Sequence, residues 1–448
     1  MRLRAHSLAL LAATTLALAP VQTAQAQSSR RDAAELRMAR NPEALGFDSQ
    51  RLKRLDAAMA KVVADGRVAG MSTLLARHGQ VVAFNHYGQQ SLATGQPMSK
   101  DTIFRIYSMT KPVTGVAMMI LFEEGKWRLD DPVSRYVPEF KNLKVMTGLN
   151  EKGEGKPVIV NANRAPTMRE VMSHTAGFGY GLGDEHPVDK LYREKEVLGS
   201  PNLQEMLVRT AAIPLVNQPG MAWRYSSSVD IQGAIIEKLS GLTLSQFFEQ
   251  RIFSPLRMTD TSFFVPPQKA SRLAANYIFN RDTGKIEEAK RAFGGDMPTY
   301  LQPPGMESGG GGLVSTTMDY ARFAQMVANG GELDGVRILS PATVELMGSN
   351  AIPKEVLVSS NGSIGARFNE AVGFGMDFMV VNDPRRAGTL EGEGSMSWGG
   401  AAGTWFWVDP TNDIIFVGMI QRMGGTGGDD LGGLSRTLVY QALVDPKK

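Results

Sequence analysis

The stretch TIFRIYSMTKPVTG, residues 102–115, contains an S-x-x-K tetrad that runs from Ser108 to Lys111. Residues 108–124 follow a helical pattern, and Pro112 is tolerated in a helix only within the first turn. We therefore expect Ser108 at or beside a helix N-terminus, with Lys111 one turn further along the same face.

The tetrad has the residue types that a serine nucleophile requires. Serine attacks poorly until another group removes its proton, and Lys111 can reach back to Ser108 from the next turn. A lysine acts as a base only while it is neutral, so we expect burial and nearby positive charge to lower the pKa of Lys111. The backbone N–H of Ser108 can be one oxyanion donor. A helix cap followed by a surface lysine gives the same pattern, so the tetrad needs support from other segments.

Tyr225 is a second candidate for proton transfer. The segment PGMAWRYSSS, residues 219–228, places Tyr225 and Ser227 after a Pro-Gly turn and before a helical pattern. A tyrosine phenolate is a competent general base when cations depress its pKa. The alternative interpretation is an aromatic residue that only packs at the start of a helix.

A third candidate element is Trp398-Gly399-Gly400, at the start of WGGAAGTWFWVDP, residues 398–410. Small residues in a strand allow a ligand to approach the backbone closely. The N–H of Ala401 can then be the second oxyanion donor. The alternative is a β-bulge in a core strand.

Five segments in this order resemble the β-lactamase-related serine hydrolases, a group that contains class C β-lactamases, DD-peptidases and family VIII carboxylesterases. The resemblance extends from about residue 45 to residue 445. It implies an α/β (α+β) fold of the β-lactamase/transpeptidase type, in which helices flank an antiparallel sheet and a mainly helical domain is inserted. The segments are TIFRIYSMTKPVTG (102–115), MREVMSHTAGFGYG (168–181), PGMAWRYSSS (219–228), SGGGGLVSTTMDYARF (308–323) and WGGAAGTWFWVDP (398–410).

The resemblance implies a role for each candidate residue. Ser108 corresponds to the acylated serine, Lys111 to the lysine that shares its proton, and Tyr225 to the tyrosine of the family's Y-x-N motif. His174 matches a position that we interpret as a hydrogen-bonded scaffold histidine. The segment that begins at Trp398 takes the place of the family's K-T-G motif.

Two departures from the family's motifs concern the substrate. Ser227 stands where the Y-x-N asparagine helps hold the amide side chain of a β-lactam or peptide, and a serine reaches less far. Trp398 stands where the K-T-G lysine offers a cation to the substrate carboxylate. Both departures favour esters with apolar groups, and W-G-G resembles the esterase branch. The expected reaction is therefore ester hydrolysis through an acyl-enzyme on Ser108, without a cofactor. The expected oxyanion and substrate-binding residues are Ala401, Trp398, Gly399, Gly400 and Ser227.

Other functions stay open at this level. A β-lactamase, a DD-peptidase or an acyltransferase would use the same site, and a catalytically inactive scaffold would keep the same fold. The scaffold has the least support, because the serine, the lysine and the tyrosine are all present. An α/β-hydrolase is excluded, because no serine of the chain lies in a G-x-S-x-G elbow.

Strand patterns occur at both ends of the chain, and helical patterns occur in its middle. We expect an α/β sheet domain from residues 45–130 and 300–448, and a mainly helical domain with long loops from residues 131–299. Residues 147–158 have the composition of a polar insertion, and residues 181–203 that of a long surface loop. Local patterns further predict a helix at 49–65 capped by Ser49, a hairpin turn at His78-Gly79-Gln80, helices at 229–239 and 243–252, and four strands between Gly373 and Ile420.

The composition excludes several classes of protein. The chain has no cysteine, so disulfides, thiolate nucleophiles and cysteine metal sites are excluded. None of its 5 histidines has HExxH spacing, so we expect no metal site. The net charge is only +3 and no dense basic run occurs, so we expect no nucleic-acid partner. The expected partner is a small-molecule ester or, in the alternative, a β-lactam.

The first 26 residues predict export. Arg2 and Arg4 form a basic start, an apolar run covers Leu8 to Ala19, and small residues before Gln27 form a cleavage signal. The run is shorter than the roughly 20 apolar residues that span a bilayer, and no later stretch could span one. We expect cleavage after residue 26, a flexible leader at 27–44, and a mature protein in the periplasm or outside the cell.

Overall fold

A computed structural model describes residues 35–149, 154–182, 186–292, 295–358, 365–424 and 430–447. The expected signal peptide, residues 1–26, lies outside the described residues. The described end of the predicted leader is not an irregular segment, because Arg37–Met38 forms strand β1 and pairs with β3. Residues 36–448 form one compact unit, so the division into a sheet domain and a helical domain stays a prediction.

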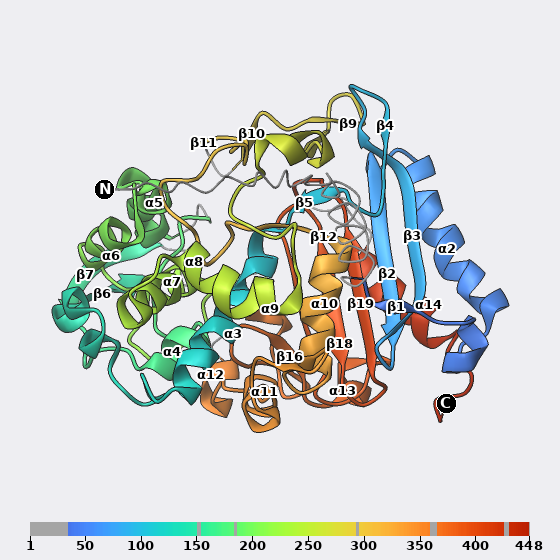
Figure 1. The fold of residues 1–448 in the computed structure, drawn as a ribbon. Helices are drawn as coiled ribbons and strands as arrows, with labels where there is room; N and C mark the ends of the chain where they lie inside the picture. The colour runs from blue at the N-terminus through green and yellow to red at the C-terminus, as the bar shows by residue number, and fades with distance from the viewer. Residues whose placement is uncertain are drawn as a thin grey trace, which may run out of the picture. The chain divides into compact units, whose positions relative to one another are not determined.

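One large sheet dominates this unit (Figure 1). Its strand order is β1-β3-β2-β19-β18-β17-β16-β15, and β4 pairs with β3. Every pairing is antiparallel except that of β1 with β3. The N-terminal hairpin β2–β3 therefore pairs with the last strand, as the strand patterns at both ends of the chain predict. The strands are β1 (Arg37–Met38), β2 (Gly70–Arg77), β3 (Gln80–Ser91), β4 (Gln96–Pro97), β15 (Val372–Phe374), β16 (Met379–Val381), β17 (Met396–Gly399), β18 (Trp405–Asp409) and β19 (Ile414–Met419).

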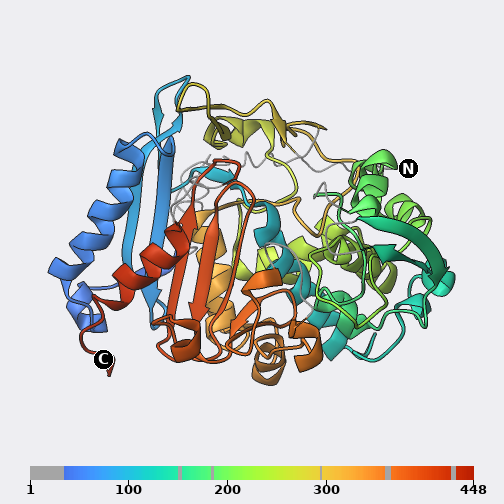
Figure 2. The ribbon, with the colours of Figure 1, turned by 180° about the vertical axis from the view of Figure 1, so that it is seen from behind.

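Successive side chains of the central strands point to opposite faces of the sheet, and both faces are buried. Trp405 and Trp407 of β18 pack in one apolar cluster with the helices α2 (Ser49–Ala64) and α14 (Leu431–Tyr440). Figure 2 shows these two helices lying together against the sheet. Phe406 and Val408 lie in the main core on the opposite face, which α10 (Thr317–Ala328) covers.

The predicted N-terminal helix and hairpin are confirmed with two corrections at their ends. Helix α2 begins at Ser49, but its N-cap is Asp48, whose side chain accepts a hydrogen bond from the N–H of Arg51. His78 and Gly79 form the hairpin turn with φ angles of 50° and 69°, whereas Gln80, expected in the turn, already begins β3. Two consecutive residues with positive φ form a turn whose twist matches that of the two strands it connects.

Two segments that we expected to be irregular contain regular secondary structure. The polar stretch 147–158 forms parts of the hairpin β6 (Lys144–Leu149) and β7 (Gly155–Asn161), apart from residues 150–153, which lie outside the described residues. The stretch 181–203 contains the helix α5 (Pro187–Glu194). Both were missed because turn residues outnumber periodic apolar residues there, and β7 is exposed along its whole length.

Helices α3 to α9 and three small hairpins make up the rest of the middle of the chain. The predicted helices at 229–239 and 243–252 are α7 and α8, and a π-helical turn at Glu249–Phe253 follows α8. None of the helices in the described residues has the length and apolar character needed to span a membrane. The elements are α3 (Thr110–Glu123), α4 (Met168–Met172), α6 (Leu203–Ala211), α7 (Ser228–Ser240), α8 (Leu244–Phe248), α9 (Ser254–Leu256), β8 (Tyr277–Asn280), β9 (Lys285–Glu288), β10 (Arg291–Ala292) and β11 (Gly295–Asp296).

The carboxyl of Asp319, in the first turn of α10, makes the stability of the fold depend on pH. Its Oδ2 accepts hydrogen bonds from the N–H of Asp260 at 2.7 Å and from the hydroxyl of Thr261 at 2.9 Å. Burial, and next the charge of Asp260, raise the pKa of Asp319 to about 7 from an ordinary 3.8. The folded state thus keeps a proton that the unfolded state releases near pH 4, roughly the ordinary pKa of an aspartate.

This proton stabilises the fold fully below about pH 4, and its contribution is lost as the pH rises towards about 7. Relative to Asp319→Asn, we expect the free energy of unfolding of the wild type to fall by about 4 kcal/mol across that interval. Urea unfolding of both proteins at the two ends of the interval measures this difference. A pH dependence shared equally by both proteins would show that Asp319 is ionised in the folded state.

Candidate functional site

A tight turn between a strand and a helix presents Ser108. Strand β5 (Ile103–Arg105) pairs with β12 (Val314–Thr316), and a 3-10 turn at Tyr107–Met109 leads directly into α3. Tyr107 has a left-handed φ of 43°, a conformation that a bulky residue rarely adopts. Its hydroxyl accepts a hydrogen bond from Asn276 at 3.1 Å and donates one to the sulfur of Met297 at 3.3 Å. These contacts hold the turn, in which Ser108 is only half-buried.

Lys111 is fully buried one turn after Ser108. Its Nζ donates three hydrogen bonds, to Ser108 Oγ at 3.2 Å, to the Tyr180 hydroxyl at 2.9 Å and to the Gly310 carbonyl at 2.6 Å. The Nζ also lies 4.5 Å from the centre of the Tyr225 ring. An ammonium has three N–H donors, so this environment suits the charged form.

The pKa of Lys111 differs from the sequence expectation. Burial lowers the pKa of Lys111, but the phenol oxygens of Tyr180 and Tyr225 raise it by more, so that it ends above its ordinary value. The expectation of a lowered pKa is therefore wrong. It considered burial and nearby positive charge and did not include Tyr180, which accepts a hydrogen bond from Nζ.

The hydroxyl of Tyr225 donates a hydrogen bond to Ser108 Oγ at 2.7 Å. Tyr225 lies just before α7, and its ring packs against the rings of His174, 5.1 Å away between centres, and Trp398, 5.6 Å away. Ser108 Oγ thus contacts both predicted proton-handling groups. The structure brings these three residues together from segments more than 100 positions apart in the sequence, since Ser108 and Tyr225 are separated by 117 positions.

Sequence reasoning missed Tyr180. It lies in the segment GFGYG that follows His174, and its glycine neighbours were the only signal of a special backbone there. The N–H groups of Tyr180 and Gly181 both donate to Asp189 Oδ1, at 2.8 Å and 2.9 Å, and Asp189 in turn pairs with Arg224. This ion pair fixes the backbone that places the Tyr180 hydroxyl on Lys111.

The buried geometry of His174 suits the scaffold role. It is fully buried, and its Nδ1 shares a hydrogen bond with the Ser226 hydroxyl at 2.9 Å. Burial, and next the charge of Lys111, hold the pKa of His174 well below its usual range, so the imidazole is neutral. Because Ser226 directly follows Tyr225, His174 braces the segment that carries this tyrosine.

Strand β17 brings the segment that begins at Trp398 to the Ser108 turn. The strand ends at Gly399, and Gly400 lies so close to the backbone of Ile106 that an added Cβ would be 2.4 Å from its carbonyl oxygen. Ala401 follows directly, and no hydrogen bond from its N–H occurs among the described residues. The expected second oxyanion donor is therefore near the nucleophile and not engaged elsewhere in the described chain.

Trp398 and Ser227 differ in their access to this site. The ring of Trp398 is half-buried and lies 5.3 Å from the ring of Phe374 between centres. Ser227 is fully buried, and its hydroxyl donates to Tyr192 at 3.5 Å. The structure thus places Trp398 beside the site and directs the Ser227 hydroxyl to a buried tyrosine.

Gly400 allows a direct test of this close packing. Its added Cβ would also lie 2.3 Å from Thr404 Oγ1, so Gly400→Ala must displace the backbone at Ile106, two residues before Ser108. We expect kcat/KM on an ester to fall roughly 100-fold, the effect of a misplaced catalytic group. The matched control is Gly199→Ala, whose added Cβ would meet only Glu196 Cβ at 3.6 Å. Equal activity of the two variants would contradict this role of Gly400.

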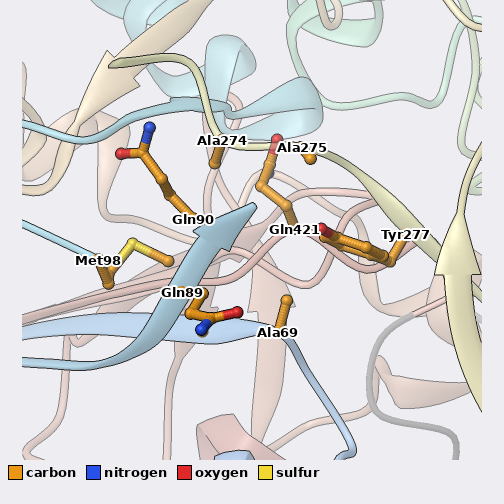
Figure 3. A pocket seen from close by; sticks show the side chains of 9 residues that line it. Ala69, Gln89, Gln90, Met98, Ala274, Ala275, Tyr277 and Gln421 are labelled. Carbon is orange, nitrogen blue, oxygen red and sulfur yellow. The ribbon is translucent and has the colours of Figure 1, made fainter. Parts of the chain in front are cut away.

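Two other features of the structure do not provide a ligand site. The hollow in Figure 3 lies between the end of the β2–β3 ladder and residues 274–277, with Gln90 and Gln421 on its wall. It contains no interior space for a water molecule. No group of three His, Asp or Glu side chains that could hold a metal ion occurs in the described part of the chain.

The arrangement suits acyl transfer. A half-buried serine hydroxyl contacts a tyrosine hydroxyl and a buried ammonium, which can move its proton and balance developing negative charge. The N–H of Ala401, which makes no hydrogen bond within the described residues, suits an oxyanion. This chemistry requires no cofactor.

One protein family and several known proteins match this chain over most of its length. The family model described as Beta-lactamase matches residues 55–440. An uncharacterized protein of Mycobacterium tuberculosis is 35% identical over 370 residues, which are 82% of this chain and 89% of that protein. Esterase EstB of Burkholderia gladioli is 29% identical over 389 residues, which are 82% of this chain and 90% of EstB.

The similarity extends to the fold of a solved structure. EstCE1, described as a hydrolase with promiscuous acyltransferase activity, superposes with a TM-score of 0.72 at 27% identity. The match covers 87% of this chain and 99% of EstCE1. The similarity therefore includes the sheet, the helical middle of the chain and the segments that meet at Ser108.

Proposed function

The chain belongs to the β-lactamase family, and from this premise we propose that it hydrolyses carboxylic esters through an acyl-enzyme on Ser108. One observation carries the proposal: Ser108 Oγ lies 2.7 Å from the Tyr225 hydroxyl and 3.2 Å from Lys111 Nζ. A nucleophile with two proton-handling partners is what a serine hydrolase needs, and an inactive scaffold has no use for it.

The proposed reaction has two steps. Tyr225 reacts as the phenolate, which the Lys111 ammonium stabilises, and it takes the proton of Ser108 as Oγ attacks the ester carbonyl. The N–H groups of Ser108 and Ala401 stabilise the oxyanion, and Tyr225 returns the proton to the departing alkoxide. Water then attacks the acyl-enzyme and gives its proton to Tyr225, which passes this proton to Ser108 Oγ as the carboxylic acid departs. Lys111, as an ammonium, balances the negative charge that develops around Ser108.

The surroundings of Tyr225 support esters with apolar groups. Trp223, Phe368 and Phe374 pack with Tyr225 and Trp398 in one apolar cluster beside the site. Trp398 occupies the place where the K-T-G motif has a lysine, so no cation at that position can pair with the carboxylate of a β-lactam. Ser227, in the place of the Y-x-N asparagine, bonds Tyr192. β-Lactam hydrolysis is the weaker alternative.

Acyl transfer to an alcohol is a second candidate, supported by the description of EstCE1 as a hydrolase with promiscuous acyltransferase activity. The first step would be the same, and an alcohol would replace water as the group that attacks the acyl-enzyme. Product analysis in the presence of an added alcohol separates the two functions, because transfer yields a new ester and hydrolysis yields only the acid.

The test of the proposed function compares p-nitrophenyl butyrate with nitrocefin, and follows Ser108 labelling by a fluorophosphonate with mass spectrometry. We expect ester turnover, little nitrocefin cleavage and a label on Ser108. Fast nitrocefin cleavage would make the protein a β-lactamase. An unlabelled Ser108 with no turnover of either substrate would support the inactive scaffold.

We also propose that the mature protein acts in the periplasm or outside the cell. The basic start, the apolar run and the small residues before Gln27 support this proposal. N-terminal sequencing of the protein from the cell envelope or medium tests it. A mature chain that begins at Gln27 is expected, and an uncleaved chain confined to the cytoplasm would contradict it.

A further inference from the structure

Behind Lys111 lies a fully buried carboxyl group that the proposed reaction does not use. Asp230, in the first turn of α7, has no exposed surface. Its Oδ1 accepts hydrogen bonds from the Ser308 hydroxyl at 2.5 Å and from the N–H of Gly310 at 3.1 Å. Among the described residues, no hydrogen-bond donor reaches Oδ2. A buried polar atom without a partner is costly, so the position of Asp230 calls for an explanation.

Gly310 connects Asp230 to Lys111. Its N–H donates to Asp230, and its carbonyl accepts the shortest hydrogen bond of Lys111 Nζ, at 2.6 Å. A Cβ on Gly310 would lie 2.6 Å from Asp230 Oδ2 and 2.9 Å from the Tyr180 hydroxyl. The unpartnered oxygen and this hydroxyl therefore border the same spot. Because Tyr180 accepts a hydrogen bond from Lys111, its own proton is free to point towards Asp230.

The charge of Lys111 needs a counter-charge that its direct contacts do not provide. All three acceptors of its N–H groups are neutral oxygens, and no carboxylate of the described residues forms an ion pair with Nζ. A buried charge is stable only when it is paired. The titratable groups that face it are Tyr180, Tyr225 and His174, with the carboxyls of Asp230 and Asp377.

We propose that Asp230 is the counter-charge of Lys111 and a positioning residue for it, acting across Gly310 and the Tyr180 hydroxyl. This inference rests on the proposed function of Ser108 and Lys111. As a carboxylate, Asp230 stabilises the ammonium form of Lys111. Through Ser308 and Gly310 it also holds the carbonyl that directs Nζ towards Ser108.

Asp377 is the other buried carboxyl near Lys111, and its contacts suit a neutral acid. Its Oδ1 accepts one hydrogen bond, from Gln232 at 3.2 Å. Burial holds the pKa of Asp377 well above its usual range. Burial also raises the pKa of Asp230, but the donors Ser308 and Gly310 and the charge of Lys111 oppose this effect. Asp377 therefore provides a matched control for the loss of a buried carboxyl.

The test is the pH dependence of kcat/KM for Asp230→Asn, which keeps the shape of the side chain and removes its charge. Without a nearby negative charge, the pair of Lys111 and Tyr225 releases its proton more easily. We expect the acidic limb of the profile to move to lower pH by about one unit or more. Asp377→Asn is expected to leave the limb in place, because it replaces a neutral acid with a neutral amide.

A second variant and a second readout keep the test decisive. Ser308→Ala removes one donor from Asp230, which raises the pKa of this carboxyl, so Asp230 is protonated over more of the acidic range and the limb should move in the same direction by less. This variant decides the matter if Asp230→Asn does not fold. The rate of fluorophosphonate labelling of Ser108 is measured over the same pH range. If the wild type is labelled but hydrolyses no ester, the proposed substrate class fails while the labelling profile still tests Asp230.

Three results would overturn the inference. A folded Asp230→Asn enzyme with an unmoved limb, even at reduced kcat, would show that the side chain is structural only. An equal shift in Asp377→Asn would show that the counter-charge is not specific to Asp230. A Ser308→Ala enzyme with an unmoved limb, where Asp230→Asn is unfolded, would also contradict it.

Discussion

Replacing Ser108 with alanine is expected to reduce hydrolysis of p-nitrophenyl butyrate by roughly 10⁴-fold or more, since the loss of a serine nucleophile removes covalent catalysis altogether. The variant keeps the Ser108 backbone N–H, and the side chain is only half-buried, so the fold should be unaffected. Initial rates and thermal unfolding of the purified variant measure both effects.

Ser99→Ala is the matched control for this prediction. Its hydroxyl donates to Asp101 at 2.7 Å in the turn before β5, so the same chemical change is made a few residues upstream. We expect wild-type rates from this control. If Ser108→Ala kept a substantial part of the wild-type rate at the same purity, another nucleophile would have to be sought and the acyl-enzyme on Ser108 would be excluded.

Replacing Tyr225 with phenylalanine is expected to lower kcat on the same ester by about 10²- to 10⁴-fold, the usual contribution of a general acid-base group. The ring and its packing against His174 and Trp398 are kept, and only the hydroxyl 2.7 Å from Ser108 Oγ is removed. A stopped-flow measurement of p-nitrophenol release separates the acylation step from the hydrolysis of the acyl-enzyme.

Tyr87→Phe is the control for the tyrosine prediction. It removes a hydroxyl that donates to Asp56 of α2 at 2.7 Å, on the other side of the sheet from α3 and α10. Rates equal to the wild type are expected. A Tyr225→Phe enzyme within about threefold of the wild type would assign the proton transfer to Lys111 alone, because a lost general base costs far more than that.

The expected fold is confirmed, and the parts that sequence predicts best are those with strong local patterns. The turn at His78-Gly79 and the apolar strands β18 and β19 follow from alternation and turn residues, as does the position of Ser108 before α3. The hairpin β6–β7 was not predicted, because its outer strand is exposed on both faces and shows no alternation.

Local sequence patterns predicted only part of the candidate site. Ser108 and Lys111 are one turn apart, so their contact follows from helix geometry. Tyr180 and Gly310 contact Lys111 from two distant segments, Asp230 contacts Gly310 from a third, and no local pattern relates these residues to Lys111. The pKa of Lys111 depends on these neighbours, so its direction could not be obtained from burial alone.

The left-handed turn at Tyr107 limits how this protein could be improved for practical use. A non-glycine residue in this region carries about 1–3 kcal/mol of strain, and the hydroxyl contacts with Asn276 and Met297 hold Tyr107 in it. Selection for heat resistance would favour glycine or asparagine at position 107, because either relaxes the strain. The same change would release the loop that aims the nucleophile, so a library designed for industrial durability should keep Tyr107 and Asn276 fixed and vary the surface instead.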